Sequence, residues 1–114
     1  MHHEKLSDRE LKVMLAILRC GSDAYGPRIG EKLEQYADEK LSLGALHSAL
    51  DRLQDRKLVD SHMGEATAVR GGRRKRLFRV TGKGQIALQH ALHVMDRMRA
   101  GLDLPKGGEE GVLV

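Results

Sequence analysis

The sequence of 114 residues has few aromatic side chains, two prolines and one cysteine. Tyr25, Tyr36 and Phe78 are the aromatic residues and tryptophan is absent, so we expect a core of Leu, Ala and Met, which favours helices. Cys20 alone cannot form an internal disulfide, which fits a reducing compartment. No apolar run is long enough to cross a membrane, and none follows a basic start as in a secretory signal peptide. We therefore expect a cytoplasmic protein without a membrane partner.

The residues that are present indicate one ordered domain with an uneven charge. Leu, Ile, Val and Phe number 28, which is above the composition at which disorder is expected. The net charge is +4, and no acidic residue occurs from Ala66 through Met95. That stretch contains Arg70, Arg73, Arg74, Lys75, Arg76, Arg79 and Lys83. Charge of one sign favours a polyanionic partner, whereas a merely solvated face usually mixes signs.

Three helices are expected in the first half of the chain. Ser7 and Glu10 form a capping-box pattern, and apolar residues at helical spacing follow up to Cys20, where Gly21 ends the helix. Leu11, Met14, Leu15 and Leu18 form one face of this helix, and Val13 and Ile17 widen it, so we expect packing on two sides. A second helix starts at Pro27 and ends near Ala37. Its Leu33 and Tyr36 are apolar-face positions, and Gly30 would allow a close helix approach.

The third expected helix starts at a Ser42 cap and ends near Lys57. Its apolar face carries Leu43, Leu46, Leu50 and Leu53. The opposite face carries Gly44, Ser48, Asp51, Arg52 and Asp55, with His47 at its edge. Small side chains on this face permit close approach to another surface.

The second half predicts a ribbon and a last helix. Residues 58–63 and 75–80 are expected strands, with Phe78 and Val80 on one side of the second strand. The connection from Gly64 to Arg74 would form a mobile basic tip. After a Thr81 cap, Leu88, Leu92, Met95 and Leu102 recur at a spacing near 3.5, beside Ala91 and Met98. This spacing indicates a seam for a partner helix, although packing within one domain is the alternative.

Three helices followed by a ribbon predict a winged helix-turn-helix, a mainly α fold with a two-stranded β wing. We expect the winged-helix domain over residues 5–80, a dimerisation helix over 81–100 and a flexible tail over 101–114. The third helix would enter the major groove of double-stranded DNA and the wing would contact phosphates. A symmetric dimer would then require an inverted-repeat operator.

Three stretches resemble the signature segments of PadR-type transcriptional regulators. They are AYGPRIGEKLE (residues 24–34), LSLGALHSALDRLQDRKLV (residues 41–59) and GGRRKRLFRVTGKG (residues 71–84). The resemblance covers roughly residues 6 to 100 and implies a homodimeric repressor with a C-terminal dimerisation helix, which the first helix joins. The expected interface residues are Leu11, Leu15, Leu88, Leu92, Met95 and Met98.

The resemblance also implies the DNA-contacting residues. They fall on Ser42, His47, Ser48 and Arg52 of the third helix and on Arg73, Arg74 and Lys75 of the wing, with Tyr25 packed near this surface. Two positions depart from the family pattern. His47 stands where tyrosine is usual, and Leu77-Phe78 stands where two aromatic residues are common.

Other functions have weaker support in the sequence. His90 and His93 have a spacing that metal ligands can use, but no Cys, Asp or Glu lies nearby in that stretch, so no metal or other cofactor is expected. No catalytic motif is present, so the protein is not expected to be an enzyme. Met14, Met95 and Met98 could line a pocket for a small hydrophobic effector. The alternative function is a winged-helix protein-interaction module that does not bind specific DNA.

Overall fold

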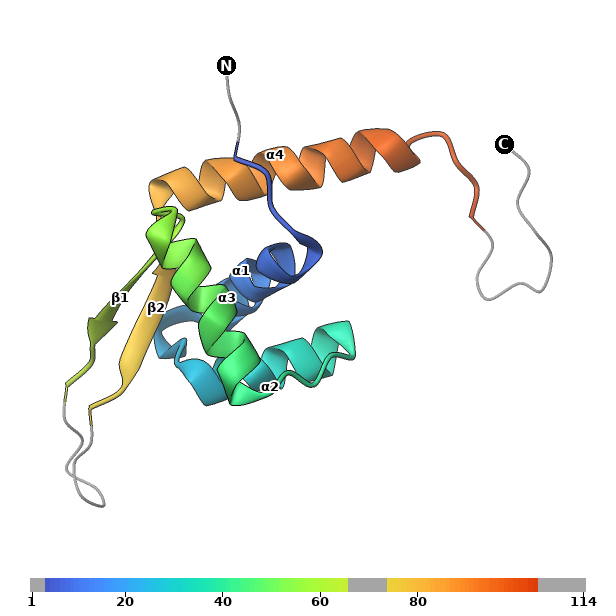
Figure 1. Cartoon of the computed structure of the whole chain (residues 1–114). Helices are drawn as coiled ribbons and strands as arrows, with labels where there is room; N and C mark the ends of the chain where they lie inside the picture. The colour runs from blue at the N-terminus through green and yellow to red at the C-terminus, as the bar shows by residue number, and fades with distance from the viewer. Residues whose placement is uncertain (1–3, 66–73, 105–114) are drawn as a thin grey trace.

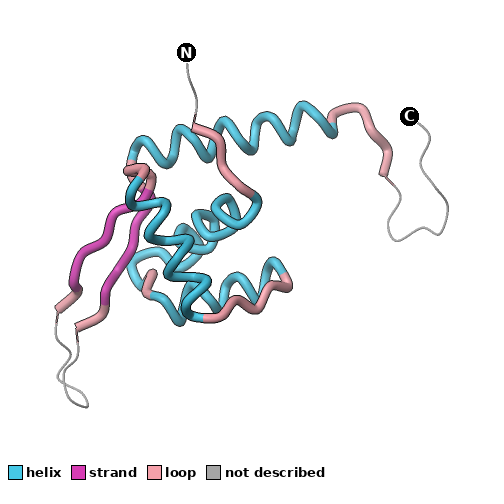
Figure 2. The backbone as a smooth tube through the Cα atoms, in the orientation of Figure 1, coloured by secondary structure: helices cyan, strands magenta, loops and turns pink. Residues whose placement is uncertain are grey.

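The computed structural model describes residues 4–65 and 74–104. Its elements follow in the order α1 (Asp8–Cys20), η1 (Gly21–Asp23), α2 (Gly26–Ala37), α3 (Leu43–Asp55), β1 (Val59–Met63), β2 (Arg76–Val80) and α4 (Gly82–Arg99). The first three α-helices form a bundle, the strands lead away from it side by side, and α4 crosses the top (Figures 1 and 2). This arrangement confirms the predicted mainly α fold with a two-stranded wing. The short η1 helix was expected only as a turn.

Three helices begin at the caps that the sequence predicts. The Ser7 hydroxyl accepts from the Glu10 amide at 3.1 Å, and the Glu10 carboxylate accepts from the Ser7 amide at 2.8 Å, which completes the capping box. The Ser42 hydroxyl accepts from the Ala45 amide at 3.1 Å, and Thr81 accepts from the Gly84 amide at 3.0 Å. These bonds satisfy amides that a helix leaves without internal partners.

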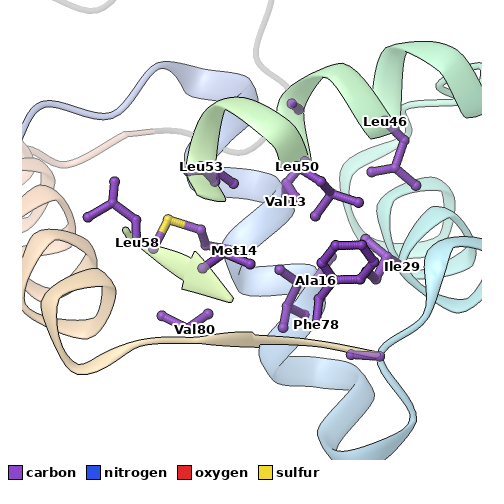
Figure 3. Close-up of a cluster of buried hydrophobic side chains, with 14 of the residues drawn as sticks. Val13, Met14, Ala16, Ile29, Leu46, Leu50, Leu53, Leu58, Phe78 and Val80 are labelled. Atoms are coloured by element: carbon purple, nitrogen blue, oxygen red, sulfur yellow. The ribbon is translucent and has the colours of Figure 1, made fainter. Parts of the chain in front are cut away.

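The core lies where α1, α2, α3 and the sheet meet (Figure 3). Leucine and alanine are its most frequent residues, and Phe78 is its only aromatic member. The buried side chains of α3 are Leu46, Ala49, Leu50 and Leu53, on the face that the sequence pattern predicts. Met14 is the one methionine of this core, so methionine contributes less to it than expected.

The sheet is antiparallel and pairs Val59 with Val80 and Met63 with Arg76. Phe78 and Val80 are buried and Arg79 is exposed, as the alternation of side chains predicts. The Phe78 amide also donates to the Ala24 carbonyl at 2.8 Å. The segment that precedes α2 is thereby fixed to the wing.

Three apolar side chains that the helical spacing assigned to buried faces are exposed. Leu18 is 48% exposed, because Val13, Met14 and Ile17 turn toward the core and Leu18 does not. Tyr36 lies on the surface under the Arg19 guanidinium, 3.8 Å from its ring centre. Leu43 is 59% exposed in the first turn of α3, beyond the end of the core.

The close helix approach suggested for Gly30 is absent from the described residues, since a Cβ atom there would meet nothing within 4 Å.

The start of α4 is held tightly against the turn between α3 and β1. The Thr81 hydroxyl donates to the Lys57 carbonyl at 2.7 Å, and the Thr81 amide donates to the Leu58 carbonyl at 3.0 Å. A Cβ atom on Gly84 would lie 2.0 Å from that Leu58 oxygen, so only glycine fits. After Leu88 no described residue of α4 is fully buried, and the second half of the helix extends past the bundle (Figure 1).

Candidate nucleic-acid interface

The exposed face of α3 has the composition that the sequence analysis assigned to it. Gly44, His47, Ser48, Asp51, Arg52 and Asp55 are all exposed. The first half of this face carries no acidic side chain, whereas Asp51 and Asp55 lie in the second half. Because phosphates repel carboxylates, the first half is the part suited to close contact with a polyanion.

Lys75, just before β2 at the open end of the ribbon, reaches the segment that precedes α2 and, through it, this first half of α3. The Lys75 ammonium lies 4.2 Å from the centre of the Tyr25 ring and 3.8 Å from an Asp23 carboxylate oxygen. Gly26 follows Tyr25, and a Cβ atom there would lie 3.8 Å from the His47 ring nitrogen Nε2. Tyr25, Lys75 and His47 therefore belong to one continuous surface. With Ser48, which follows His47 on the exposed face of α3, this surface includes four of the residues predicted to lie at the DNA interface.

Two wing arginines make no ion pair with an acidic group in the described part of the chain. Arg74 donates to the Gly64 carbonyl at 2.7 Å across the open end of the ribbon. Arg76 donates to the Ser61 hydroxyl at 3.2 Å, and Ser61 in turn donates to Gln54 of α3 at 2.7 Å. Both guanidinium groups keep an uncompensated charge. Arg73, also predicted to contact DNA, lies outside the described residues.

Two other cations of the basic stretch are neutralised by acids distant in sequence. Arg79 donates to both carboxylate oxygens of Asp60, at 2.7 and 3.2 Å, and this pairing raises the pKa of Arg79. Lys83 lies 3.2 Å from the Glu4 carboxylate. The one-sided charge inferred for residues 66–95 is therefore concentrated toward the end of the wing.

Arg52 forms no ion pair with Asp51, Asp55 or any other acidic group among residues 4–65 and 74–104. The intrahelical pairing that would make Arg52 a purely structural residue is thus absent there. Its exposed guanidinium is available to a phosphate. Ser42, by contrast, already uses its hydroxyl as the cap of α3, although it still has a donor proton.

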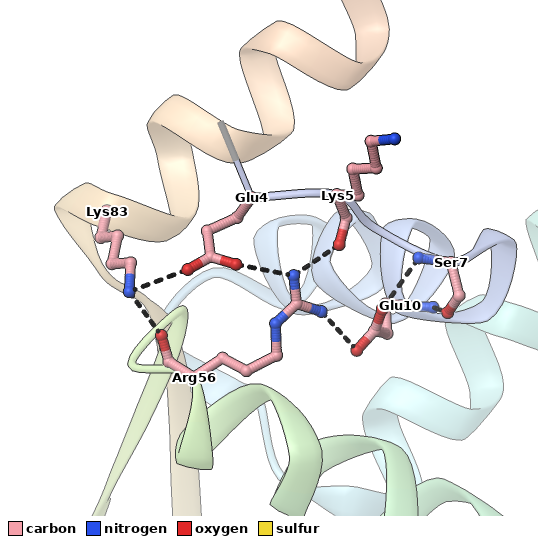
Figure 4. A network of polar contacts seen from close by, with 6 residues as sticks. All are labelled: Glu4, Lys5, Ser7, Glu10, Arg56 and Lys83. Atoms are coloured by element: carbon pink, nitrogen blue, oxygen red, sulfur yellow. Dashed lines mark hydrogen bonds and ion pairs between the residues drawn. The ribbon is translucent and has the colours of Figure 1, made fainter. Parts of the chain in front are cut away.

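A polar network links α3 to α4 through the start of the chain (Figure 4). Arg56, directly after α3, donates to Glu10 at 2.9 Å and to Glu4 at 3.1 Å. It also donates to the Lys5 carbonyl. Lys83 in the first turn of α4 binds both Glu4 and the Arg56 carbonyl. This network fixes the direction of α4 relative to α3.

Burial tends to raise the pKa of the Glu10 carboxyl, but hydrogen bonds from the Ser7 amide and from Arg56 outweigh this effect. The pKa of Glu10 therefore lies below its usual value. Hydrogen bonds from Arg56 and Lys83 likewise lower the pKa of Glu4. Both carboxyl groups are ionised at neutral pH, as the network requires.

Apolar residues on α1 and α4 form a surface away from the wing. A hollow of about 340 Å³ lies between the two helices and is lined by Leu15, Leu18, Gln85, Leu88, Gln89 and Leu92. Leu11 and Leu15 are half-buried, while Met95 and Met98 are 58% and 71% exposed. Leu88 was predicted to face a partner, but it is only 4% exposed and packs mainly within its own chain.

The structure adds residues that the sequence analysis did not select. Leu43 was placed in the core, and its exposure beside Gly26 brings it to the candidate surface. Asp23 was not considered, although it contacts Lys75. The Arg56 network joins Arg56 to Glu4 across 52 positions and Lys83 to the same Glu4 across 79 positions, and no local spacing signals such contacts.

The described residues contain no metal site and no membrane-spanning helix. No three His, Cys, Asp or Glu side chains gather there in a way that could hold a metal ion. None of the helices described is both long and apolar enough to cross a bilayer. Met14 lies in the core, apart from the exposed Met95 and Met98, so these three methionines do not line one pocket.

Comparisons with known proteins agree with this geometry. The model of the transcriptional regulator PadR-like family matches residues 14–90. A PadR-like transcription factor from Bacteroides fragilis is 25% identical, with a TM-score of 0.63 over 80% of this chain and 86% of its own. A PadR family transcription regulator from hypervirulent Clostridium difficile is 19% identical, with a TM-score of 0.63 over 78% of this chain and 90% of its own.

A winged-helix DNA-binding protein from STIV has a similar fold, with 16% identity and a TM-score of 0.66 over 86% of this chain and 98% of its own. A comparison with curated proteins found no match. The family model covers more than half of the sequence and includes α2, α3, the wing and the start of α4. The chain therefore belongs to the PadR-like family of transcriptional regulators and is a DNA-binding regulator with a winged-helix fold, not an enzyme.

Proposed function

We propose that the protein is a homodimeric repressor of the cytoplasm that binds an inverted-repeat operator through α3 and the wing. The observation that carries this proposal is the continuity of the acid-free first half of α3 with Tyr25 and with Lys75 at the open end of the wing. A helix with small and polar side chains fits the major groove, and the adjoining cations match the phosphates on its flank.

The second copy is proposed from the apolar surface of α1 and α4. Met95 and Met98 follow Leu92 in the second half of α4, which extends past the bundle (Figure 1), and they are 58% and 71% exposed. Exposed apolar side chains in such a row are typical of an interface. Burial of this row by α4 of a second copy would place two α3 helices for successive major grooves, roughly 34–36 Å apart.

The alternative, a protein-interaction module, has no comparable support, because family membership and the uncompensated wing cations both favour DNA. A small hydrophobic effector remains a separate prediction, although Met14 lies in the core and would not share a pocket with the exposed Met95 and Met98 within one chain.

The test is the salt dependence of duplex binding by the wild-type protein and by Arg74→Glu. Each cation that neutralises a phosphate contributes about 0.9 to the slope of log K against log salt. We expect Arg74→Glu to bind all sequences more weakly and with a shallower slope, by roughly 2 per dimer. Arg97→Glu on α4, far from the wing, is the matched control and should keep the wild-type slope. Unchanged duplex affinity of Arg74→Glu at low salt would refute the DNA-binding role of the wing.

A further inference from the structure

Gly44 is the second residue of α3 and the first residue of its exposed face. A Cβ atom built on Gly44 would meet nothing within 4 Å, and its backbone does not have the positive φ that favours glycine. Neither packing nor backbone conformation within the described residues therefore requires glycine here. Gly84 is the contrasting case, because the Leu58 carbonyl leaves no space for a side chain there.

Gly30 and Gly82 are equally open within the described residues, so Gly44 is distinguished by its location on the acid-free part of the exposed face of α3. Alanine at the same position would lower the conformational entropy of the unfolded chain and favour the helix. The protein thus has a less stable recognition helix than its own packing allows. A requirement imposed by a bound partner would explain this.

The neighbours of Gly44 identify the side from which a partner would come. His47 and Ser48 lie three and four residues further on and so flank Gly44 on the helix surface. All three are exposed, and the first acidic residue of this face, Asp51, lies beyond them. Gly44 therefore presents no side chain one turn before His47 and Ser48, on the half of α3 that lies beside Gly26.

We propose that Gly44 is the point of closest approach between α3 and duplex DNA, and that it sets the depth at which His47 and Ser48 meet the base edges. This inference rests on the proposed function. Hydrogen bonds to bases require donor–acceptor distances of about 2.7–3.2 Å. A methyl group on the contact surface would hold the helix away from the base edges and lengthen these bonds beyond that range.

Gly44→Ala tests the proposal because stability and binding should change in opposite directions. The thermal unfolding midpoint should stay equal or rise, and the sedimentation behaviour should match that of the wild type. Affinity for a duplex enriched by the wild-type protein from a random 30-base-pair library should fall at least tenfold, since one or two base contacts are lost. The slope against salt should stay unchanged, because no cation is removed.

Gly30→Ala is the matched control. Gly30 is also a helical glycine whose Cβ would meet nothing within 4 Å, but it lines a hollow beside Glu31 and Glu34, which a polyanion would avoid. Its unfolding midpoint should also stay equal or rise, while its duplex affinity should equal that of the wild type. Gly44→Ser provides a second, polar variant with a comparable volume, and it should also lose affinity.

The outcomes distinguish a failure of the role of Gly44 from a failure of the proposed function. If the wild type binds the enriched duplex and Gly44→Ala binds it as tightly, the role of Gly44 is refuted and the proposed function stands. If affinity also falls in Gly30→Ala, the loss reflects a general effect of the added methyl group and the proposal is refuted as well. If the wild type enriches no duplex at any salt concentration, both the proposed function and this inference are refuted.

Discussion

Glu10 is the one charged side chain that is buried among the described residues, at 6% exposure. It serves two purposes, since the same carboxylate completes the cap of α1 and binds Arg56 beyond the end of α3. A buried carboxylate is stabilising only while such partners are present. Removal of its charge should therefore lower the free energy of unfolding, because the partners of the carboxylate outweigh the cost of burying it.

Glu10→Gln should lower the free energy of unfolding by about 1–3 kcal/mol at neutral pH, because a charged hydrogen bond to Arg56 is lost. Since the pKa of Glu10 is lowered in the folded state, its ionised form stabilises the protein above the usual carboxyl pKa, and this stability is lost as the pH falls through the folded-state pKa. Urea unfolding should show a gap between wild type and variant that is present at neutral pH and closes as the pH falls below the usual carboxyl pKa. A gap that stays constant would contradict the role of the Glu10 charge.

In the proposed complex, Asp23 would compete with DNA for Lys75, which precedes β2. Because the Asp23 carboxylate lies 3.8 Å from the ammonium and both groups are partly exposed, the pair contributes less than about 1 kcal/mol. Asp23→Asn should therefore raise duplex affinity at low salt by roughly two- to fivefold. Asp38→Asn, at the end of α2, removes the same charge without freeing a wing cation and should have a smaller effect. Equal gains in duplex affinity from the two substitutions would mean that the change in net charge causes the gain, and that the release of Lys75 does not.

Among the elements, α4 depends most on one contact. The turn that precedes it is held by Thr81, and Gly84 lies against the Leu58 carbonyl with no space for a methyl group. A larger residue would force α4 away from the turn between α3 and β1. The angle between α3 and α4, and with it the spacing of two α3 helices in a dimer, depends on this contact.

Gly84→Ala should destabilise the fold by about 2 kcal/mol or more, as overpacking against a rigid backbone does. Gly82→Ala is the control in the same turn of α4, because a Cβ atom there meets nothing within 4 Å. Thermal unfolding of both variants measures the difference. A Gly84→Ala protein as stable as the wild type would mean that the close approach is not maintained in solution.

The elements themselves could be predicted because their signals are local. The pairs Ser7 and Glu10, Ser42 and Ala45, and Thr81 and Gly84 are each three residues apart, and the structure contains all of these caps. The same local reasoning placed Leu43 in the core, because periodicity does not show where a core ends. It also counted Arg79 as a free cation, since its partner Asp60 is 19 residues away and is brought close only by the register of the sheet.

At the scale of the whole molecule, the proposed binding to an inverted repeat requires a dimer of two copies of this chain. Met95 and Met98 are largely exposed and the second half of α4 extends past the bundle (Figure 1), whereas Leu92 lines the hollow beside Leu15 and Leu18 of α1. The spacing near 3.5 residues that predicted a seam is consistent with this exposure, although the sequence could not show that Leu88 turns inward.

Leu92→Asp combined with Met95→Asp should yield monomers, because two carboxylates per chain would have to be buried in the seam. Sedimentation velocity measures the change, and the circular dichroism of the variant should stay helical, since neither residue is buried in its own chain. Ile86→Asp, on another side of α4, is the control and should leave the dimer intact. A wild-type protein that sediments as a monomer at micromolar concentration would contradict the dimer.

The most direct test of the central claim is selection of bound fragments from random duplex DNA by the wild-type protein, followed by footprinting of the enriched sequence. The account predicts an inverted repeat whose half-sites are centred about one helical turn apart, or a multiple of it, on one face of the duplex. Enrichment of a single unpaired half-site, or of no sequence at all, would contradict it.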